Sequence, residues 1–149
     1  MARTGAPDID EESVIRLRNA LLRTARRLRT AGDPEGLSAS QSSVLATLVR
    51  EGPLRAGDLA DAEALNPTML SRILAHLEAR GLALRAPDPE DGRATLAQAT
   101  ADGRRLVERL RARRAALLMD WLDDLAPESR GSLLAALPAL EELAGVVRP

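Results

Sequence analysis

The sequence of 149 residues contains no cysteine, lysine, phenylalanine or tyrosine, and Trp121 and His76 are its single tryptophan and histidine. The absence of cysteine excludes disulfides, thiolate nucleophiles, Cys-based zinc sites and thiol redox sensors. A single histidine also excludes a His-rich metal site within one chain. Single-stranded nucleic-acid binders usually stack bases on aromatic rings, so an aromatic content of 1% disfavours that class of protein.

Long apolar runs and catalytic patterns are absent as well. No stretch of 18 apolar residues occurs, and Met1 to Pro7 lack the apolar core of a signal peptide, so we expect no membrane partner and a cytoplasmic location. The sequence has no Gly-rich phosphate loop, no nucleophile beside a base and no convergent cluster of histidines or carboxylates. It therefore predicts neither an enzyme nor a site for a cofactor or a metal.

Charge is nearly balanced, at a net −1 from 21 basic and 22 acidic residues, and every basic residue is arginine. Residues 104 to 114 contain six arginines against one acid, Glu108. A solvated helix face in a lysine-poor sequence is the simpler interpretation of this run. The planar guanidinium also suits phosphate contacts, so whether the run touches nucleic acid stays open.

Leucine and alanine dominate the apolar residues, which favours helices over strands. After a flexible lead at 1–10, apolar residues recur at helical spacing within 11–32, with arginines on the opposite side. A second helical region covers 101–149, where Thr100 caps a long helix and Pro138 bends or interrupts the last one. These terminal helices carry more leucine than one small core needs, so we expect them to form a homodimer interface.

The region between the terminal helices, 37–100, begins with two helices. Ser38 to Gln41 has the spacing of a capping box at the start of the first. A short second helix is expected from about Ala56 to Glu63, followed by a turn at Ala64-Leu65. This order, a helix and then a short helix with a tight turn, is typical of the first part of a helix-turn-helix.

A third helix should follow the turn, with Asn66 as its N-cap, Pro67 at its first position and Gly81 just beyond its end. Apolar residues at helical spacing give this helix one inward face. The remaining side chains turn outward: Thr68, Met69, Ser71, Arg72, Ala75 and His76. The outward set mixes small polar, cationic and apolar groups, as a helix that reads duplex DNA requires.

Two short strands, Leu82 to Arg85 and Ala94 to Ala99, are expected to form a β-hairpin around a turn-rich loop. The loop carries Arg93, and an arginine at a hairpin tip can enter the minor groove, where the potential of A·T tracts is most negative. Asp91 would repel phosphate, so its expected role is to orient Arg93. Arg85, in the first strand of the hairpin, is a third candidate for DNA contact.

The loop also holds a cluster of acids, Asp88, Glu90 and Asp91, which we interpret as turn residues rather than a cation site. Together these patterns predict a mainly α fold with a small β-hairpin wing. The architecture is a winged helix-turn-helix at 37–100, flanked by N- and C-terminal dimerisation helices. Such a fold could place side chains in two grooves of double-stranded DNA at once.

Seven short motifs follow one another along the chain: Leu37-Ser-Ala-Ser-Gln41, Gly52-Pro-Leu54, Asp58-Leu-Ala60, the Asn66-to-Arg72 helix start, Leu77-Glu-Ala-Arg-Gly81-Leu82, Asp91-Gly-Arg93 and Thr100-Ala-Asp-Gly103. This arrangement resembles the multiple antibiotic resistance regulator (MarR) family of dimeric winged-helix transcription factors. The match covers roughly residues 12–146. The Asp-x-Arg wing followed by Thr-x-x-Gly is its more specific part, because a helix-turn-helix alone occurs in many families.

The resemblance implies that the helix from Pro67 to His76 enters the major groove. Thr68, Ser71 and Arg72 would then reach base edges or phosphates. Pro67 and Met69 would make apolar contacts, and His76 would face a phosphate or solvent. The implied DNA-binding residues are therefore Pro67, Thr68, Met69, Ser71, Arg72 and His76 on the helix, with Arg93, Asp91 and Arg85 on the wing.

The resemblance also implies a homodimer that sets two such helices about 34–36 Å apart on a pseudo-palindromic operator. Members of the family are usually regulated by a small molecule that binds between the dimerisation helices and the winged domain and changes the spacing of the two recognition helices. We expect a repressor, although the sequence does not distinguish repression from activation. An apolar pocket with an arginine would suit an aromatic acid or a lipophilic phenol. The sequence does not indicate which residues line that pocket, nor the operator or the regulated genes.

Three residues depart from the family pattern. Ala64 stands where the family often has glycine, so we expect that turn to avoid a left-handed conformation. Glu63 occupies a position that is usually apolar, and Arg55 replaces the usual Ser or Thr cap of the short helix. These departures all lie at the ends of the short helix expected from about Ala56 to Glu63, so they affect how that helix packs.

A second function stays open, that of a winged helix used for protein interaction or DNA architecture without operator specificity. Between Asn66 and Thr100, four arginines are balanced by four acids. A region that reads DNA with so little excess charge must rely on the placement of a few arginines.

Overall fold

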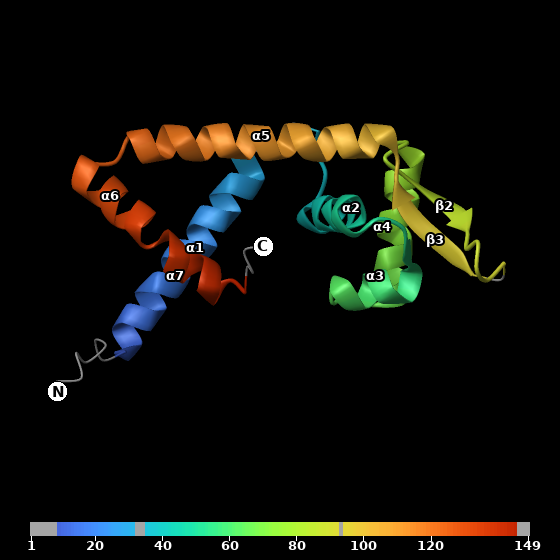
Figure 1. Ribbon diagram of the computed structural model, residues 1–149, viewed down its shortest axis with the longest axis horizontal. Coiled ribbons are helices and arrows are strands. Elements are labelled where there is room, and N and C mark those ends of the chain that lie inside the picture. The colour runs from blue at the N-terminus through green and yellow to red at the C-terminus, as the bar shows by residue number, and fades with distance from the viewer. Residues whose placement is uncertain (1–8, 32–34, 93, 146–149) are drawn as a thin grey trace.

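The computed structural model describes residues 9–31, 35–92 and 94–145. In chain order the elements are α1 (Glu11–Ala31), α2 (Ala39–Glu51), β1 (Leu54–Arg55), α3 (Ala56–Ala62), α4 (Pro67–Ala79), β2 (Ala83–Pro87), β3 (Thr95–Ala99), α5 (Ala101–Asp123), α6 (Pro127–Ala135) and α7 (Leu137–Leu143). Figure 1 shows α2, α3, α4 and the hairpin grouped at one end of α5, and α1, α6 and α7 grouped toward the other. The mainly α winged-helix class expected from the sequence is confirmed.

The sheet is antiparallel, in the order β1-β3-β2. The hairpin of β2 and β3 was expected, with Pro87 paired to Thr95 and Ala83 to Ala99. Strand β1 was not expected, because two residues are too few to show an alternating pattern. It forms because Leu54 and Arg55 pair with Ala97 and Leu96 on the free edge of β3. The wing, defined here as residues 83–99, thus has a third strand along its base.

One hydrophobic core lies in what we term the winged head, which comprises α2, α3, α4, the sheet and the first turns of α5. Its largest fully buried side chains are Val44, Leu45, Leu48, Leu59, Leu70, Leu74, Leu77 and Leu106. Among the described residues, α1, α6 and α7 contain no buried side chain. The head therefore has a core of its own, whereas the terminal helices do not.

The expected helix ends are confirmed by their hydrogen bonds. Ser38 and Gln41 form the capping box of α2, with 3.2 Å from Gln41 N to Ser38 Oγ. The Asn66 side chain accepts a 2.8 Å hydrogen bond from Met69 N at the start of α4. Pro138 lies in the first turn of α7, so it separates the last two helices as expected. These caps satisfy N–H groups that have no partner within the helix.

The expectation for Ala64 was wrong. Its φ is +50°, in the left-handed region. Leu65 N donates to Ala60 O at 2.9 Å and Ala64 N donates to Asp61 O at 3.2 Å, which is the hydrogen-bond pattern of a Schellman motif at the end of α3. Leu65 also packs against the core. The two hydrogen bonds and this burial hold an alanine in a conformation that glycine adopts without strain.

Glu63 has a specific partner in the head. Its Oε1 accepts a 2.6 Å hydrogen bond from the hydroxyl of Thr47, which is only 3% exposed. Arg50 also donates to that hydroxyl at 3.1 Å. An acidic side chain at a position where an apolar one was expected is thus explained, because it satisfies a buried hydroxyl of α2.

The two longest helices, α1 and α5, contact one another. The guanidinium carbon of Arg27 lies 3.9 Å from the centroid of the Trp121 ring, a cation–π contact between them. Within the described parts of the chain, no helix has both the length and the apolar character needed to cross a membrane.

Candidate nucleic-acid interface

Helix α4 has one face in the core and one face in solvent. Leu70, Ile73, Leu74 and Leu77 are buried. All six helix residues singled out from the sequence, Pro67, Thr68, Met69, Ser71, Arg72 and His76, are exposed. Four buried residues on one side fix the rotation of the helix about its axis, and so fix which side chains a ligand can reach.

A groove of about 870 Å³ lies beside the exposed face of α4, between this helix and the start of α2. It is lined by Ser38, Ser40, Gln41, Asn66, Thr68, Met69, Arg72, Ile73 and His76. Four of the six predicted helix residues therefore share one concave surface. The sequence did not assign Ser38 to Gln41 to this surface, because their capping signal explains only the start of α2.

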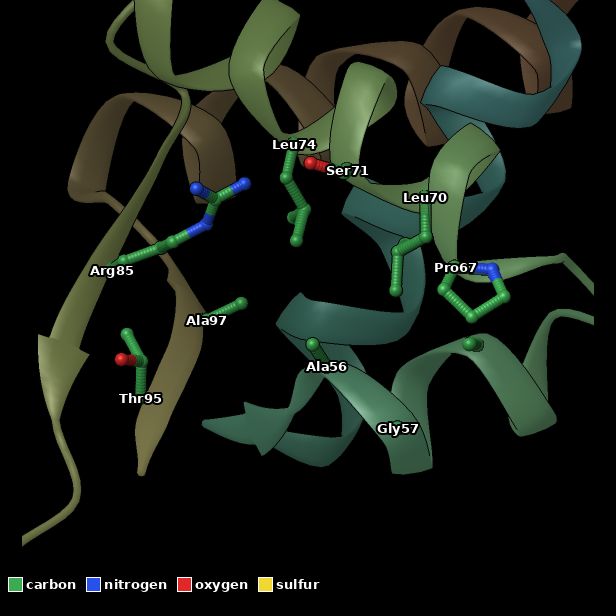
Figure 2. Close-up of a pocket in the computed structure, with 10 residues that line it drawn as sticks. Ala56, Gly57, Pro67, Leu70, Ser71, Leu74, Arg85, Thr95 and Ala97 are labelled. Atoms are coloured by element: carbon green, nitrogen blue, oxygen red, sulfur yellow. The ribbon is translucent and has the colours of Figure 1, made fainter. Parts of the chain in front are cut away.

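Pro67 and Ser71 lie on the other flank of α4. They line a pocket of about 330 Å³ between α3, α4 and the sheet, together with Arg85 and Thr95. Figure 2 shows the Arg85 side chain extending from the sheet toward α4, with Leu70, Leu74 and Ala97 as apolar walls. The six residues of α4 thus divide between the two sides of the helix.

Arg85 lies at the base of the wing rather than near its tip. Its Nε is 3.6 Å from Glu78 Oε1 on α4, and its side chain is 40% exposed. An exposed ion pair at this distance is weak. The guanidinium therefore stays available to other anions at the junction between α4 and the wing.

The predicted tip residue Arg93 lies outside the described residues, and so does any contact between it and Asp91. Asp91 itself is exposed, and its carbonyl oxygen accepts a 2.8 Å hydrogen bond from Ala94 N. No group of three or more His, Asp or Glu residues able to hold a metal occurs in the described ranges.

Asp88 has an environment unlike that of the other acids of the wing loop. It is 7% exposed, whereas Glu90 and Asp91 are exposed. Its Oδ1 accepts a 2.9 Å hydrogen bond from Glu90 N, as in an Asx-type turn. The turn role expected for this residue is therefore confirmed. Its burial and its second partner were not foreseen.

That second partner is Arg55. Its Nε and Nη2 both donate to Asp88 Oδ2, at 3.0 and 2.6 Å. The backbone N–H of Glu90 and then the Arg55 side chain hold the pKa of Asp88 below its usual value. Hydrogen bonding to Asp88 in turn raises the pKa of Arg55. The only sequence signal for this pair is that an arginine stands where a helix cap was expected.

Comparison with known proteins places this geometry in a family. The model of the MarR family matches residues 37–95, which contain α2 to α4, β2 and the start of β3. The HTH-type transcriptional regulator ML2140 of Mycobacterium leprae is 35% identical over 136 residues, covering 91% of this chain and 95% of that protein.

Solved structures share the fold. The crystal structure of RV1404 from Mycobacterium tuberculosis superposes with a TM-score of 0.77 and 28% identity, covering 93% of this chain and 99% of that one. A mutant of S. aureus MepR bound to an oligodeoxyribonucleotide superposes with a TM-score of 0.67 at 19% identity, covering 92% of this chain and 99% of that one.

Three findings agree. A relative matches over nearly its whole length, the family model matches the helix-turn-helix, and solved structures have the same fold. The relatives are transcriptional regulators and not enzymes. The chain belongs to the MarR family and is a transcriptional regulator with a DNA-binding winged-helix fold.

Proposed function

We propose that this regulator binds a pseudo-palindromic operator in double-stranded DNA as a homodimer and represses transcription from it in the cytoplasm. The observation that carries the proposal is α4, whose inner face is buried while its outer face presents Thr68, Ser71 and Arg72. Hydroxyl and guanidinium groups on an exposed helix can hydrogen-bond base edges in the major groove. The oligodeoxyribonucleotide bound to MepR, a protein of the same fold, supports this use of the head.

The terminal helices support the homodimer. Apolar side chains between 44% and 67% exposed lie on α1 and at the end of α7: Val14, Ile15, Leu17, Leu21, Leu22 and Leu143. Several of them line an apolar groove of about 710 Å³. Because exposed apolar patches of this size are unfavourable in water, we propose that the same helices of a second copy cover them.

Dimerisation through this end of the molecule leaves the exposed face of α4 free to contact DNA. In Figure 1 both α1 and α7 lie away from α3 and α4. A two-fold axis through the terminal helices would present one α4 to each half of an operator, with the two helices about 34–36 Å apart. Because two copies of α4 would contact bases, the dimer would read both halves of the operator and so bind it more specifically than one copy could.

We further propose that a small aromatic acid relieves repression by binding at the junction of the terminal helices and the head. A pocket of about 210 Å³ there is lined by Arg29, Thr30, Leu37, Ala39, Ser42 and Arg114. Arg114 Nε is buried and has no hydrogen-bond partner among the described residues. A buried donor without a partner is costly, and a carboxylate would supply one.

Such an acid regulates only if it prefers one arrangement of the dimer. The pocket lies between α1, α2 and α5, since Arg29 and Arg114 come from the two long helices and Ser42 from α2. Filling it would change how the head sits against these helices. The spacing of the two α4 helices, and hence operator affinity, would follow.

The alternative function, an architectural or protein-binding winged helix, is favoured by the balance of four arginines and four acids from Asn66 to Thr100. Such a module would bind DNA without regard to sequence, or not at all. The placement of Arg72 on the exposed face of α4 favours the operator-binding function over this one.

Footprinting tests the proposal on the DNA upstream of the protein's own gene. We expect a protected pseudo-palindrome at physiological salt, with protection lost when millimolar benzoate is added. Binding that ignores sequence, or no binding, would favour the architectural function instead. Protection that persists with benzoate and other aromatic acids would remove the effector from the proposal and leave operator binding intact.

A further inference from the structure

The contact between Arg55 and Asp88 joins two distant parts of the head. Arg55 lies in β1, at the N-cap position of α3, and makes no side-chain hydrogen bond to cap that helix. Its guanidinium instead reaches a residue 33 positions later in the sequence. An N-cap position normally carries a short polar side chain, so the arginine forgoes the local capping contact for a distant one.

The contact spans the whole sheet. Arg55 pairs with Leu96 on one side of the central strand β3, and Ala86 pairs with the same Leu96 on the other side. Asp88 follows directly after the end of β2. Because neighbouring strands lie about 4.8 Å apart, the guanidinium must cross β3 to reach the loop. The pair therefore connects the edge strand β1 to the loop that follows the opposite edge strand, β2.

On the wing side, Asp88 organises the loop. Its backbone N–H donates to Ala94 O at 2.9 Å and its Oδ1 accepts from Glu90 N at 2.9 Å. Strand β1 ends at Arg55, opposite Leu96, so toward the tip only Pro87 and Thr95 still pair, without the support of β1. Two-stranded ribbons twist strongly and are only marginally stable alone. An anchor at this position is therefore well placed to fix the direction of the hairpin loop.

Arg55 is poorly suited to a direct role in binding phosphate. Asp88 takes two of its donors, and Asp58 and Asp91 also lie near enough to favour its charged form. Three carboxylates around one guanidinium cancel most of its attraction for a distant anion. Its charge serves to hold Asp88.

We infer that Arg55 and Asp88 are positioning residues for DNA binding. Their two-point contact holds the wing against β1 in the orientation that lets the wing reach the minor groove of DNA, next to the major groove that α4 occupies. This inference rests on the operator binding proposed above. It assigns to Asp88, an acid in a DNA-binding wing, a favourable effect on DNA affinity.

That sign makes the inference testable. Asp88→Asn removes a negative charge and keeps an Oδ1 acceptor for Glu90 N. If Asp88 were only a surface acid, or if freed Arg55 contacted phosphate, the variant would bind the operator as tightly as wild type or more tightly. If the pair positions the wing, affinity falls, by roughly tenfold. The two alternatives thus predict opposite changes.

The experiment measures the operator affinity of the full-length protein and its hydroxyl-radical footprint, for wild type, Arg55→Gln, Asp88→Asn and the double variant. We expect each single variant to lose protection at the outer minor-groove positions only. The double variant should bind no more weakly than the weaker single variant, since one contact is removed in all three. Arg50→Gln, which breaks the 2.8 Å ion pair with Glu51 at the end of α2, is the control and should keep the full footprint.

Asp88→Asn binding with wild-type affinity and an unchanged footprint would overturn the inference. Should circular dichroism show that Asp88→Asn is unfolded, Arg55→Lys replaces it. Lysine keeps the charge but cannot make the forked contact, so loss of the outer protection supports the inference and a full footprint overturns it. A wild-type protein that protects no site would instead refute the proposed function, whatever the variants do.

Discussion

Thr100 and Gly81 join the end of α4 to α5, the long helix that follows the wing. The hydroxyl of Thr100 donates a 2.7 Å hydrogen bond to Gly81 O, just past the end of α4, and Thr100 N donates to Leu82 O at 3.0 Å. The same hydroxyl accepts from Gly103 N at 3.0 Å and so caps α5. One side chain thus fixes the start of α5 against the end of α4.

The close approach at this joint requires glycine at 103. A Cβ built there would lie 2.1 Å from Leu82 O and 3.1 Å from Leu45 Cδ1. We expect Gly103→Ala to lower the free energy of unfolding by about 2 kcal/mol, because backbone must shift in a packed region. Urea denaturation followed by circular dichroism measures this. Gly131→Ala in α6, where nothing lies within 4 Å of the added Cβ, is the matched control and should be neutral or slightly stabilising. Equal effects of the two substitutions would show that contact with Leu82 is not the cause.

Ala64 should gain from replacement by glycine. Its φ of +50° places a Cβ in the left-handed region, and glycine removes that strain at the cost of more freedom in the unfolded chain. We expect Ala64→Gly to raise the free energy of unfolding by about 0.5 kcal/mol. The same substitution in the interior of α5, Ala112→Gly, should lower it by about 1 kcal/mol. Thermal unfolding of the two variants distinguishes them by sign, and destabilisation by both would contradict the left-handed turn.

The depressed pKa of Asp88 predicts a pH dependence of stability. Its pKa in the folded protein lies below the usual value of 3.8 because Glu90 N–H and Arg55 stabilise the carboxylate. The stabilisation is therefore fully present above about pH 4 and is lost as the pH falls through the folded-state pKa. Asp88→Asn should be less stable than wild type at pH 7, and the difference should shrink below pH 4. Chemical denaturation at pH 7 and pH 3 measures both values. A difference that is the same at the two pH values would mean that the charge of Asp88 contributes nothing.

Arg72 is the residue of α4 on which operator affinity should depend most. It is exposed and lines the groove beside the start of α2. We expect Arg72→Ala to weaken operator binding by about 1–3 kcal/mol, roughly five- to 150-fold, as is usual for loss of an arginine that contacts a base. Fluorescence anisotropy with the footprinted operator measures it. Arg50→Ala at the end of α2 removes the same charge at a residue that does not line this groove and should bind normally. Equal losses in both variants would indicate an effect of net charge alone.

Leu17 tests the dimer. It is 48% exposed on α1 and lines the apolar groove that a second copy is proposed to cover. Leu17→Glu would place a charge in that interface, so we expect a monomer at micromolar concentration in size-exclusion chromatography with light scattering, and loss of operator binding. Leu84→Glu, at a residue 38% exposed on β2, should leave the oligomeric state unchanged. A wild-type protein that is already monomeric would contradict the dimer directly.

Much of the fold could be predicted because its signals are local. Helix caps at Ser38, Asn66 and Thr100 depend on hydrogen bonds to residues three positions away. The outward set on α4 follows from the periodicity of its leucines. What could not be predicted involves residues far apart in sequence: β1 exists only through pairing with β3, and Glu63 finds its partner on α2.

The sequence by itself therefore determined the order of elements, the ends of the helices and the exposed face of α4, because each depends on interactions within a turn or two of one segment. Only the tertiary structure decided that Arg55 holds Asp88, that Arg85 turns toward α4, and that Ala64 adopts a left-handed conformation. The physical reason is common to all three. A long side chain can choose among several partners and a turn among several conformations, and the packing of elements distant in sequence selects one.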